Sequence, residues 1–191
     1  TDGTPEGTYM LKDIRRGPEG GSISEITVVG ELAYFAADDG ANGVELWRTD
    51  GTDHPFFATL PAFPEIRPGP ASSSPSGLTN LKGELVFVAD DGIHGRELWK
   101  MDLDRHELTL VADIPPGPDS SNPSQLRAVE GRLYFTANEG FNGVELWASD
   151  GIPFAFNGTR LVEDIVLGPV SSSPQHLTKL NGTLFFQTNP E

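Results

Sequence analysis

Glu45-Leu46-Trp47 recurs further along the chain as Glu97-Leu98-Trp99 and Glu145-Leu146-Trp147, at steps of 52 and 48 residues. A period near 50 residues is the length of one propeller blade and is far longer than a leucine-rich repeat. A second landmark, an acidic residue followed by isoleucine, keeps nearly the same step. It is found at residues 13–14, 65–66, 113–114 and 164–165. The chain is therefore built from tandem repeats.

Each repeat contains four short apolar segments, which predict four strands, while frequent Gly and Pro leave little room for helices. The first two segments are joined by two residues that include glycine, as in a tight hairpin. The third is the Glu-Leu-Trp segment, and the fourth is expected at the sheet edge, where proline is tolerated. The first strand is expected at 26–29, 78–81, 126–129 and 177–180. The second is expected at 33–35, 85–87, 133–135 and 184–186. The fourth is expected at 9–14, 60–66, 108–114 and 159–165.

Four antiparallel strands with two apolar faces are typical of a blade that is covered on both sides by neighbours. We expect an all-β, β-propeller-type array of four such blades in a single repeat domain, either a four-bladed ring or a segment of a larger propeller. The repeat units run over about 1–48, 49–100, 101–148 and 149–191. Because residues 1–14 supply a fourth strand and residues 174–191 supply the first two, we expect these ends to pair if the ring closes.

Residues 45–52, Glu-Leu-Trp-Arg-Thr-Asp-Gly-Thr, resemble the signature of the ELWxxDGT repeat proteins of bacteria, and the resemblance spans the whole chain. Two copies depart from the signature, with Leu103-Asp104 in place of Gly-Thr and Ile152 in place of the last Thr. The resemblance implies a propeller-like module that is secreted or lies at the cell surface. Its expected partners are a protein or a carbohydrate there, the rest of a larger parent chain, or a second copy.

Composition narrows the partners further. The 191 residues carry 13 Lys and Arg against 28 Asp and Glu, a formal net charge of −15, so nucleic acid is excluded as a partner. We expect no membrane insertion, because no apolar run approaches the ~18 residues of a membrane span. The chain has no cysteine, which rules out disulfides and thiolate metal sites.

Acidic hairpins before each Glu-Leu-Trp segment suggest a possible cofactor, calcium, because they gather oxygen ligands around glycines. The same residue types are also turn formers, so plain turns are the alternative. The candidate ligands are Asp38, Asp39, Asn42, Glu45, Asp90, Asp91, Glu97, Asn138, Glu139 and Glu145. A glutamate packed between blades needs a hydrogen-bonding partner, and we expect the Ser-rich loops or a backbone N–H to supply it. The tryptophans are expected to pack between blades.

Aromatic residues that break the repeat are the better candidates for a ligand-binding surface, since binding faces are built on loops. They are Phe56, Phe57, Phe63, Phe141, Phe154 and Phe156. The sequence carries no nucleophile-elbow, HExxH or Walker motif, so we expect no enzyme activity. The favoured function is non-catalytic binding or scaffolding. A calcium-stabilised, lectin-like propeller is the alternative, and a glycosidase or lyase is a weaker one.

Overall fold

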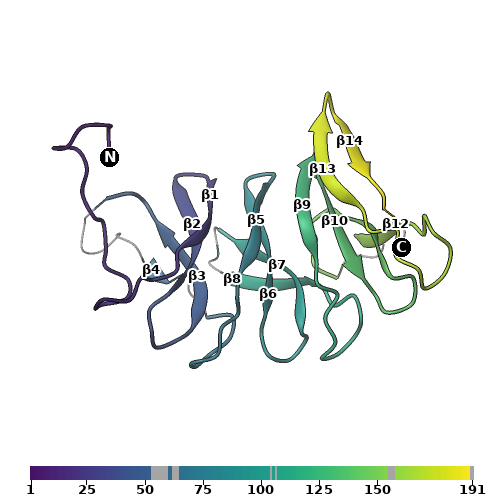
Figure 1. The fold of residues 1–191 in the computed structure, drawn as a ribbon, viewed down its shortest axis with the longest axis horizontal. Helices are drawn as coiled ribbons and strands as arrows, with labels where there is room; N and C mark the ends of the chain where they lie inside the picture. The colour runs from purple at the N-terminus through teal and green to yellow at the C-terminus, as the bar shows by residue number, and fades with distance from the viewer. Residues whose placement is uncertain (53–59, 62–64, 104, 106, 155–157, 190–191) are drawn as a thin grey trace.

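The computed structural model describes all residues except 53–59, 62–64, 104, 106, 155–157 and 190–191. The described part of the chain is all-β, and no helix in it could cross a membrane. Three four-stranded antiparallel sheets stand side by side, followed by a two-stranded sheet (Figure 1). The all-β class and the repeated four-stranded sheets that the sequence predicts are therefore confirmed.

The strand order within each four-stranded sheet follows the chain, so each sheet is a simple meander. Sheet 1 contains β1 (Ser24–Val29), β2 (Leu32–Asp38), β3 (Val44–Thr49) and β4 (Leu60–Pro61). Sheet 2 contains β5 (Ser76–Leu81), β6 (Glu84–Asp90), β7 (Arg96–Asp102) and β8 (Glu107–Ala112). Sheet 3 contains β9 (Ser124–Val129), β10 (Arg132–Asn138), β11 (Val144–Ser149) and β12 (Thr159–Glu163). The terminal hairpin contains β13 (Gln175–Leu180) and β14 (Thr183–Gln187).

The hairpins between the first two strands have the expected two-residue connections. Lys82 and Gly83 both have positive φ, at 57° and 86°, as a type I′ turn requires. Gly30 alone has positive φ in the first hairpin, 62°, which is the type II′ pattern. These turns set the strand register, which pairs Leu81 with Glu84.

The sheets pack face to face, and the core lies between them. One apolar cluster joins Val29, Tyr34 and Leu46 of sheet 1 to residues of sheet 2 that include Phe87 and Trp99. A second cluster joins sheet 2 to sheet 3 and contains Trp147. The predicted packing of tryptophans between sheets is therefore confirmed for Trp99 and Trp147, whereas Trp47 packs with Phe35, Ala37 and Ile14 on the other side of sheet 1. The first strands β1, β5, β9 and β13 lie next to one another along one side of the array.

The expected fourth strand at 9–14 is not formed, and Tyr9 and Met10 are 57% and 75% exposed. In the three sheets the fourth strand pairs with a Glu-Leu-Trp strand, and residues 9–14 have no such neighbour. The edge strand expected at 60–66 is reduced to Leu60–Pro61. Because β4 pairs with β3, sheet 1 crosses the boundary between the units 1–48 and 49–100.

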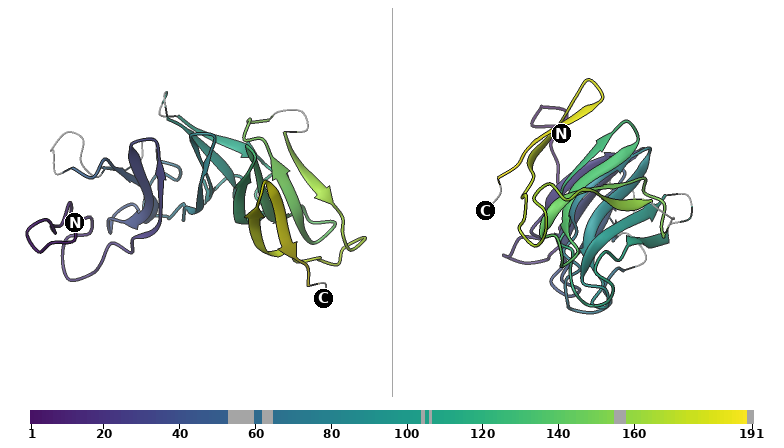
Figure 2. Two further views of the ribbon diagram at one scale, coloured as in Figure 1. Left: turned by 90° about the horizontal axis from the view of Figure 1, so that it is seen from above. Right: turned by 90° about the vertical axis from the view of Figure 1, so that its right-hand side faces the viewer.

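The array is an open arc. The N-terminus and the C-terminus lie at opposite ends of it in Figures 1 and 2, and β13 and β14 pair only with each other. The pairing of residues 1–14 with the last hairpin is therefore not formed, and the four-bladed ring is not present in this structure. Figure 2 shows the sheets following one another along the long axis of the molecule, with the last hairpin at the end opposite sheet 1.

Candidate functional site

The glutamate of each Glu-Leu-Trp segment binds a serine of the loop that leads into the next sheet. Glu97 accepts hydrogen bonds from the backbone N–H of Ser121 at 2.6 Å and from its hydroxyl at 2.5 Å. Glu45 binds Ser73 at 2.7 and 2.5 Å. Glu145 binds Ser172 at 2.6 and 2.5 Å. The sequence-based expectation of a Ser-loop or backbone partner for these glutamates is confirmed.

These carboxylates are buried, and burial changes the acidity of Glu97 and Glu45. Desolvation raises the pKa of Glu97 to about 7, although the hydrogen bonds from Ser121 and from the Ile114 backbone act in the opposite direction. Desolvation likewise raises the pKa of Glu45. Both oxygens of Glu97 accept hydrogen bonds. One accepts from the Ser121 N–H, and the other accepts from the Ser121 hydroxyl and from the Ile114 N–H, which lies 3.4 Å away. This arrangement gives the three glutamates a structural role between sheets.

The acidic hairpins are closed by their own hydrogen bonds. One Asp39 oxygen accepts from the N–H groups of Ala41 and Asn42, each at 2.8 Å, and the other accepts from the Asn42 side chain at 2.9 Å. Desolvation acts to raise the pKa of Asp39, but these hydrogen bonds outweigh it and lower the pKa. Asp91 has the same arrangement, with the His94 ring at 2.7 Å in place of the asparagine amide, and its pKa is also lowered.

Asp38 and Asp90 join the hairpin to the loop before it. Asp38 binds Arg15 at 2.5 Å, and Asp90 binds Arg67 at 3.0 Å. Within the residues that the structure describes, no group of three or more His, Asp or Glu side chains is placed to hold a metal ion. These hydrogen bonds support the interpretation of the hairpins as plain turns, because the Asp side chains bind the backbone of their own loops. Calcium remains an untested alternative.

The third hairpin differs from the other two. Asn138 stands where the others have Asp38 and Asp90, and Pro115 stands where they have the pairing arginine. An open hollow of about 440 Å³ lies beside this hairpin, and Pro115, Asp119, Glu139 and Phe141 contribute to its lining. One oxygen of Glu139 is buried without a hydrogen-bond partner.

The predicted ligand-binding aromatics are not brought together. Phe141 is 78% exposed at the β10–β11 turn, and Phe154 is 72% exposed beyond the far end of β11. The six-residue strand β11 separates them. The remaining candidates, Phe56, Phe57, Phe63 and Phe156, lie outside the described residues. Phe141 thus stands beside a hollow, while Phe154 belongs to a different surface.

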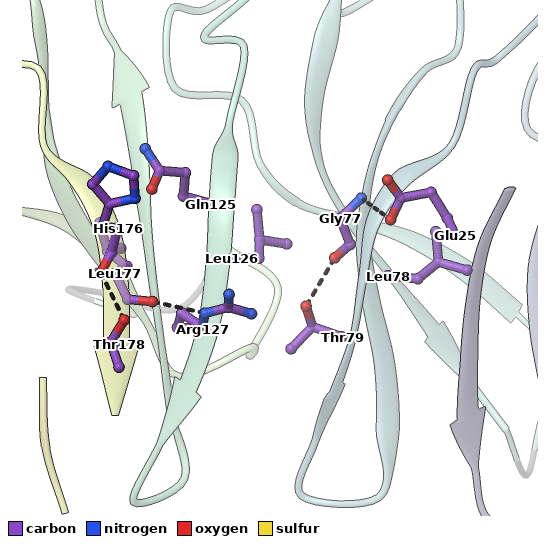
Figure 3. A pocket seen from close by; sticks show the side chains of 10 residues that line it. All are labelled: Glu25, Gly77, Leu78, Thr79, Gln125, Leu126, Arg127, His176, Leu177 and Thr178. Carbon is purple, nitrogen blue, oxygen red and sulfur yellow. Dashed lines mark hydrogen bonds between the residues drawn. The ribbon is translucent and has the colours of Figure 1, made fainter. Parts of the chain in front are cut away.

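A polar pocket that sequence reasoning missed lies along the adjacent first strands β1, β5, β9 and β13. It has a volume of about 410 Å³, and Figure 3 shows its side chains. Equivalent positions in the four strands hold Glu25, Gly77, Gln125 and His176. All four have positive φ, at 61°, 63°, 54° and 56°, and all four lie at irregularities in the strand register. We call this row of positions the inner bulges.

Side chains of the pocket also connect neighbouring sheets. Glu25 accepts a hydrogen bond from the N–H of Gly77 at 3.1 Å. Gln125 donates to the carbonyl of Pro174 at 2.8 Å, and Arg127 donates to the carbonyl of Leu177 at 2.7 Å. The pocket is therefore built across three sheet junctions and contains an acid, an amide, a guanidinium and an imidazole (Figure 3).

Left-handed backbone at a residue with a side chain is uncommon, and it is strained relative to glycine. Gly77 adopts it without strain, and its presence at the equivalent position is the one sequence signal that could have marked the bulge. The other three positions carry large polar side chains, which hide that signal.

Comparison of the chain with protein-family models gave no match, and the searches of curated proteins and of solved structures likewise found no similar protein. The resemblance to the ELWxxDGT repeat proteins therefore stays a prediction from the sequence.

Proposed function

We propose that the chain is a non-catalytic binding scaffold, secreted or at the bacterial cell surface, and that its ligand contacts the inner bulges. The observation that carries this proposal is the contrast between constant and varied positions. The glutamate, leucine and tryptophan that join the sheets recur in all three copies, whereas the inner bulges hold Glu25, Gly77, Gln125 and His176 in turn. A repeated frame with varied side chains on one surface is how repeat proteins build extended binding surfaces.

The chemistry of the pocket favours a polar ligand. Glu25 offers acceptors, Arg127 and Gln125 offer donors, and His176 provides a ring that can stack or hydrogen bond. Carbohydrates and extended peptides both present such groups. The buried glutamates are engaged by serines, so they are structural rather than catalytic in this proposal.

A binding screen tests the proposal. The protein is applied to a panel of glycans and a panel of extracellular peptides. Each retained probe is recovered, and mass spectrometry shows whether its mass has changed. We expect at least one probe to be retained without chemical change. The variant Gln125→Ala/His176→Ala should lose it, while the exposed-position variant Glu107→Ala on β8 should keep it. Recovery of a cleaved probe, or equal retention by all three proteins, would contradict the proposal.

A carbohydrate site beside Phe141 is a second candidate, and the unpartnered Glu139 oxygen favours it. Sugar sites combine an exposed aromatic ring with carboxylate and amide groups, and Phe141, Glu139 and Asn138 line one hollow. Its test is the same glycan panel with Phe141→Ala. Loss of a glycan in this variant but not in Gln125→Ala/His176→Ala would assign binding to this hollow.

A further inference from the structure

The three junctions between neighbouring first strands differ in their side-chain contacts. We call them the first junction (β1 and β5), the second junction (β5 and β9) and the third junction (β9 and β13). At the first junction the carboxylate of Glu25 accepts a hydrogen bond from the N–H of Gly77 at 3.1 Å. Two residues further along β1, the hydroxyl of Thr27 donates to the carbonyl of Leu78 at 2.9 Å. Side chains of β1 therefore contact the backbone of β5 at two places.

The third junction has contacts at the same two positions of its leading strand. Gln125, at the bulge, donates to the carbonyl of Pro174 at 2.8 Å. Arg127, two residues further along β9, donates from Nε to the carbonyl of Leu177 at 2.7 Å. Leu177 is the equivalent of Leu78, so both junctions use the same backbone carbonyl.

The second junction has neither contact. The bulge residue of β5 is Gly77, which has no side chain, and the hydroxyl of Thr79 donates to the carbonyl of Gly77 in its own strand at 2.8 Å. In the part of the chain that the structure describes, no hydrogen bond joins residues 77–79 to residues 125–127. Both segments line the pocket of about 410 Å³ (Figure 3). Polar groups of the second junction therefore face the pocket rather than one another.

The β9 side of the second junction presents hydrogen-bond donors. The backbone at Gln125 has nearly the conformation of Gly77, with φ 54° against 63°, and the Gly77 N–H is directed to the preceding strand. By this equivalence the Gln125 N–H is directed toward β5. Arg127 adds its two terminal nitrogens, which lie on the side of the pocket nearer to Thr79 in Figure 3. Among the described residues no carboxylate forms an ion pair with Arg127.

One acceptor lies beside these donors. The carbonyl of Leu126 is equivalent to those of Leu78 and Leu177, which accept side-chain hydrogen bonds at the other two junctions. At the second junction the equivalent donor is Thr79, whose hydroxyl is used within β5. A ligand that matches this surface therefore needs a negatively charged acceptor and, close to it, a hydroxyl donor.

We propose that the second junction binds the carboxylate of a uronic acid residue in an acidic glycan, in the place that the Glu25 carboxylate occupies at the first junction. This inference rests on the function proposed above and specifies its ligand. A uronic acid carries its carboxylate on a ring with hydroxyl groups. One ring therefore supplies the acceptor for Arg127 and the Gln125 N–H together with a donor for the Leu126 carbonyl. An acidic side chain of a peptide supplies only the acceptor.

Charge favours this ligand locally, although the whole chain is acidic. The net charge of −15 repels an anion at a distance. At about 0.15 M ionic strength the Debye length is about 8 Å, so the distant carboxylates are screened, whereas a guanidinium in contact with a carboxylate is screened much less. Glu25, the acidic residue of the pocket lining, is bound to the Gly77 N–H. Anion binding at the second junction therefore depends on Arg127.

Equilibrium dialysis with a matched pair of probes tests this proposal. The probes are a short oligomer of galacturonic acid and the methyl ester of the same oligomer, which keeps the rings and loses the charge. At about 0.15 M salt and millimolar probe, we expect the acid to bind and the ester to bind about tenfold more weakly or less, because the charge-assisted hydrogen bonds are lost. No binding of the acid, or equal affinities for the two probes, would overturn the proposal.

Two variants and a control locate the site. Arg127→Gln, at an exposed position, should weaken binding of the acid by about tenfold or more. Arg105→Gln makes the same change in the turn between β7 and β8, away from the pocket, and should leave binding unchanged. Gly77→Glu adds the side chain that Glu25 carries at nearly the same φ, 63° against 61°, and should exclude the probe. Circular dichroism verifies each fold, and Arg127→Gln decides the question if Gly77→Glu does not fold.

Further outcomes separate this inference from the function proposed above. The ligand assignment is wrong, while the binding surface stands, if the galacturonic acid oligomer is not bound but a panel probe is retained and then lost in Gln125→Ala/His176→Ala. Binding of a short oligo-glutamate peptide in place of the oligomer, with the same dependence on Arg127, would replace the glycan by an acidic peptide. Full binding of the oligomer to Arg127→Gln would exclude the second junction as its site.

Discussion

Glu97 and Ser121, 24 residues apart, share two hydrogen bonds, one to the backbone N–H and one to the hydroxyl of the serine. Both residues are buried, at 0% and 1% exposure. Because Glu97 lies on β7 of sheet 2 and Ser121 lies in the loop leading to sheet 3, the pair fixes one sheet relative to the next. The same contact at Glu45 and Glu145 makes it the repeated polar element of the array.

Removal of the serine hydroxyl should weaken the array measurably. Above pH 7, where Glu97 is ionised, we expect Ser121→Ala to lower the free energy of unfolding by about 2 kcal/mol, since a hydrogen bond to a charged group contributes roughly 1.5–3 kcal/mol. Urea unfolding followed by circular dichroism measures the change. Ser24→Ala, at an exposed position, is the control and should stay within about 0.5 kcal/mol of the original protein. Equal effects of the two substitutions would show that the contact contributes nothing.

The raised pKa of Glu97, about 7, makes stability depend on pH. Below about 4.5, its ordinary value, Glu97 is protonated in both the folded and the unfolded chain. Between about 4.5 and 7 the unfolded chain loses this proton more readily, so stability falls as the pH rises, by roughly 3 kcal/mol in total. Above pH 7 this contribution is constant.

Glu97→Gln checks this contribution, because an amide of the same shape does not titrate. We expect urea unfolding at a series of pH values to give a flatter profile for the variant between pH 4.5 and 7. The raised pKa of Glu45 leaves part of the slope in place. A profile for Glu97→Gln that is parallel to that of the original chain would contradict the assignment.

Local turn chemistry and the repeat predicted much of this fold. The two-residue hairpins, the Glu-Leu-Trp strand and the serine partner of its glutamate all follow from residues within one repeat. Whether the array closes into a ring could not be predicted, because closure depends on how successive sheets pack on one another and not on the pattern within one repeat. The strand expected at 9–14 is not formed for a related reason. A fourth strand forms by pairing with a Glu-Leu-Trp strand, and the apolar pattern of residues 9–14 does not show whether such a partner is present.

The candidate site was less accessible to sequence reasoning. The aromatics were chosen because they break the repeat, and Phe141 and Phe154 turned out to lie at opposite ends of β11. The inner bulges depend on backbone conformation, and residues such as Gln125 and His176 give no local sign of positive φ. Only an alignment that sets them against Gly77 would have indicated the bulge.

The glycines that precede each Glu-Leu-Trp strand allow two chain segments to approach closely. A Cβ on Gly95 would lie 2.7 Å from the carbonyl oxygen of Asp119 and 2.8 Å from that of Pro118. Gly140 has a similar positive φ, 95° against 69°, but nothing lies within 4 Å of its Cβ position. We expect Gly95→Ala to be more destabilising than Gly140→Ala by about 2 kcal/mol, because only the first adds a backbone clash. Comparable urea midpoints for the two variants would refute the close-approach explanation.

Calcium should have little effect on thermal stability if the hairpin carboxylates serve only their own turns. The Asp39 and Asp91 oxygens already accept hydrogen bonds from their own loops. A ligand that binds only the folded state raises the free energy of unfolding by about 2.7 kcal/mol at about 100 times its Kd, and the melting temperature rises with it. We expect the same Tm in millimolar calcium and in chelator. A higher Tm with calcium would instead support the calcium-stabilised alternative.

The left-handed backbone at His176 offers a test of whether stability is given up for binding. His176→Gly relieves the strain at φ 56°, whereas His176→Ala keeps it and removes only the ring. We expect the glycine variant to be more stable than the alanine variant by about 0.5–1 kcal/mol in urea unfolding, after allowance for the greater freedom of glycine in the unfolded chain. Both variants lack the imidazole, so both should lose any probe that the original protein retains through the inner bulges. A glycine variant less stable than the alanine variant would show that the bulge is unstrained, so that no stability is given up for binding there.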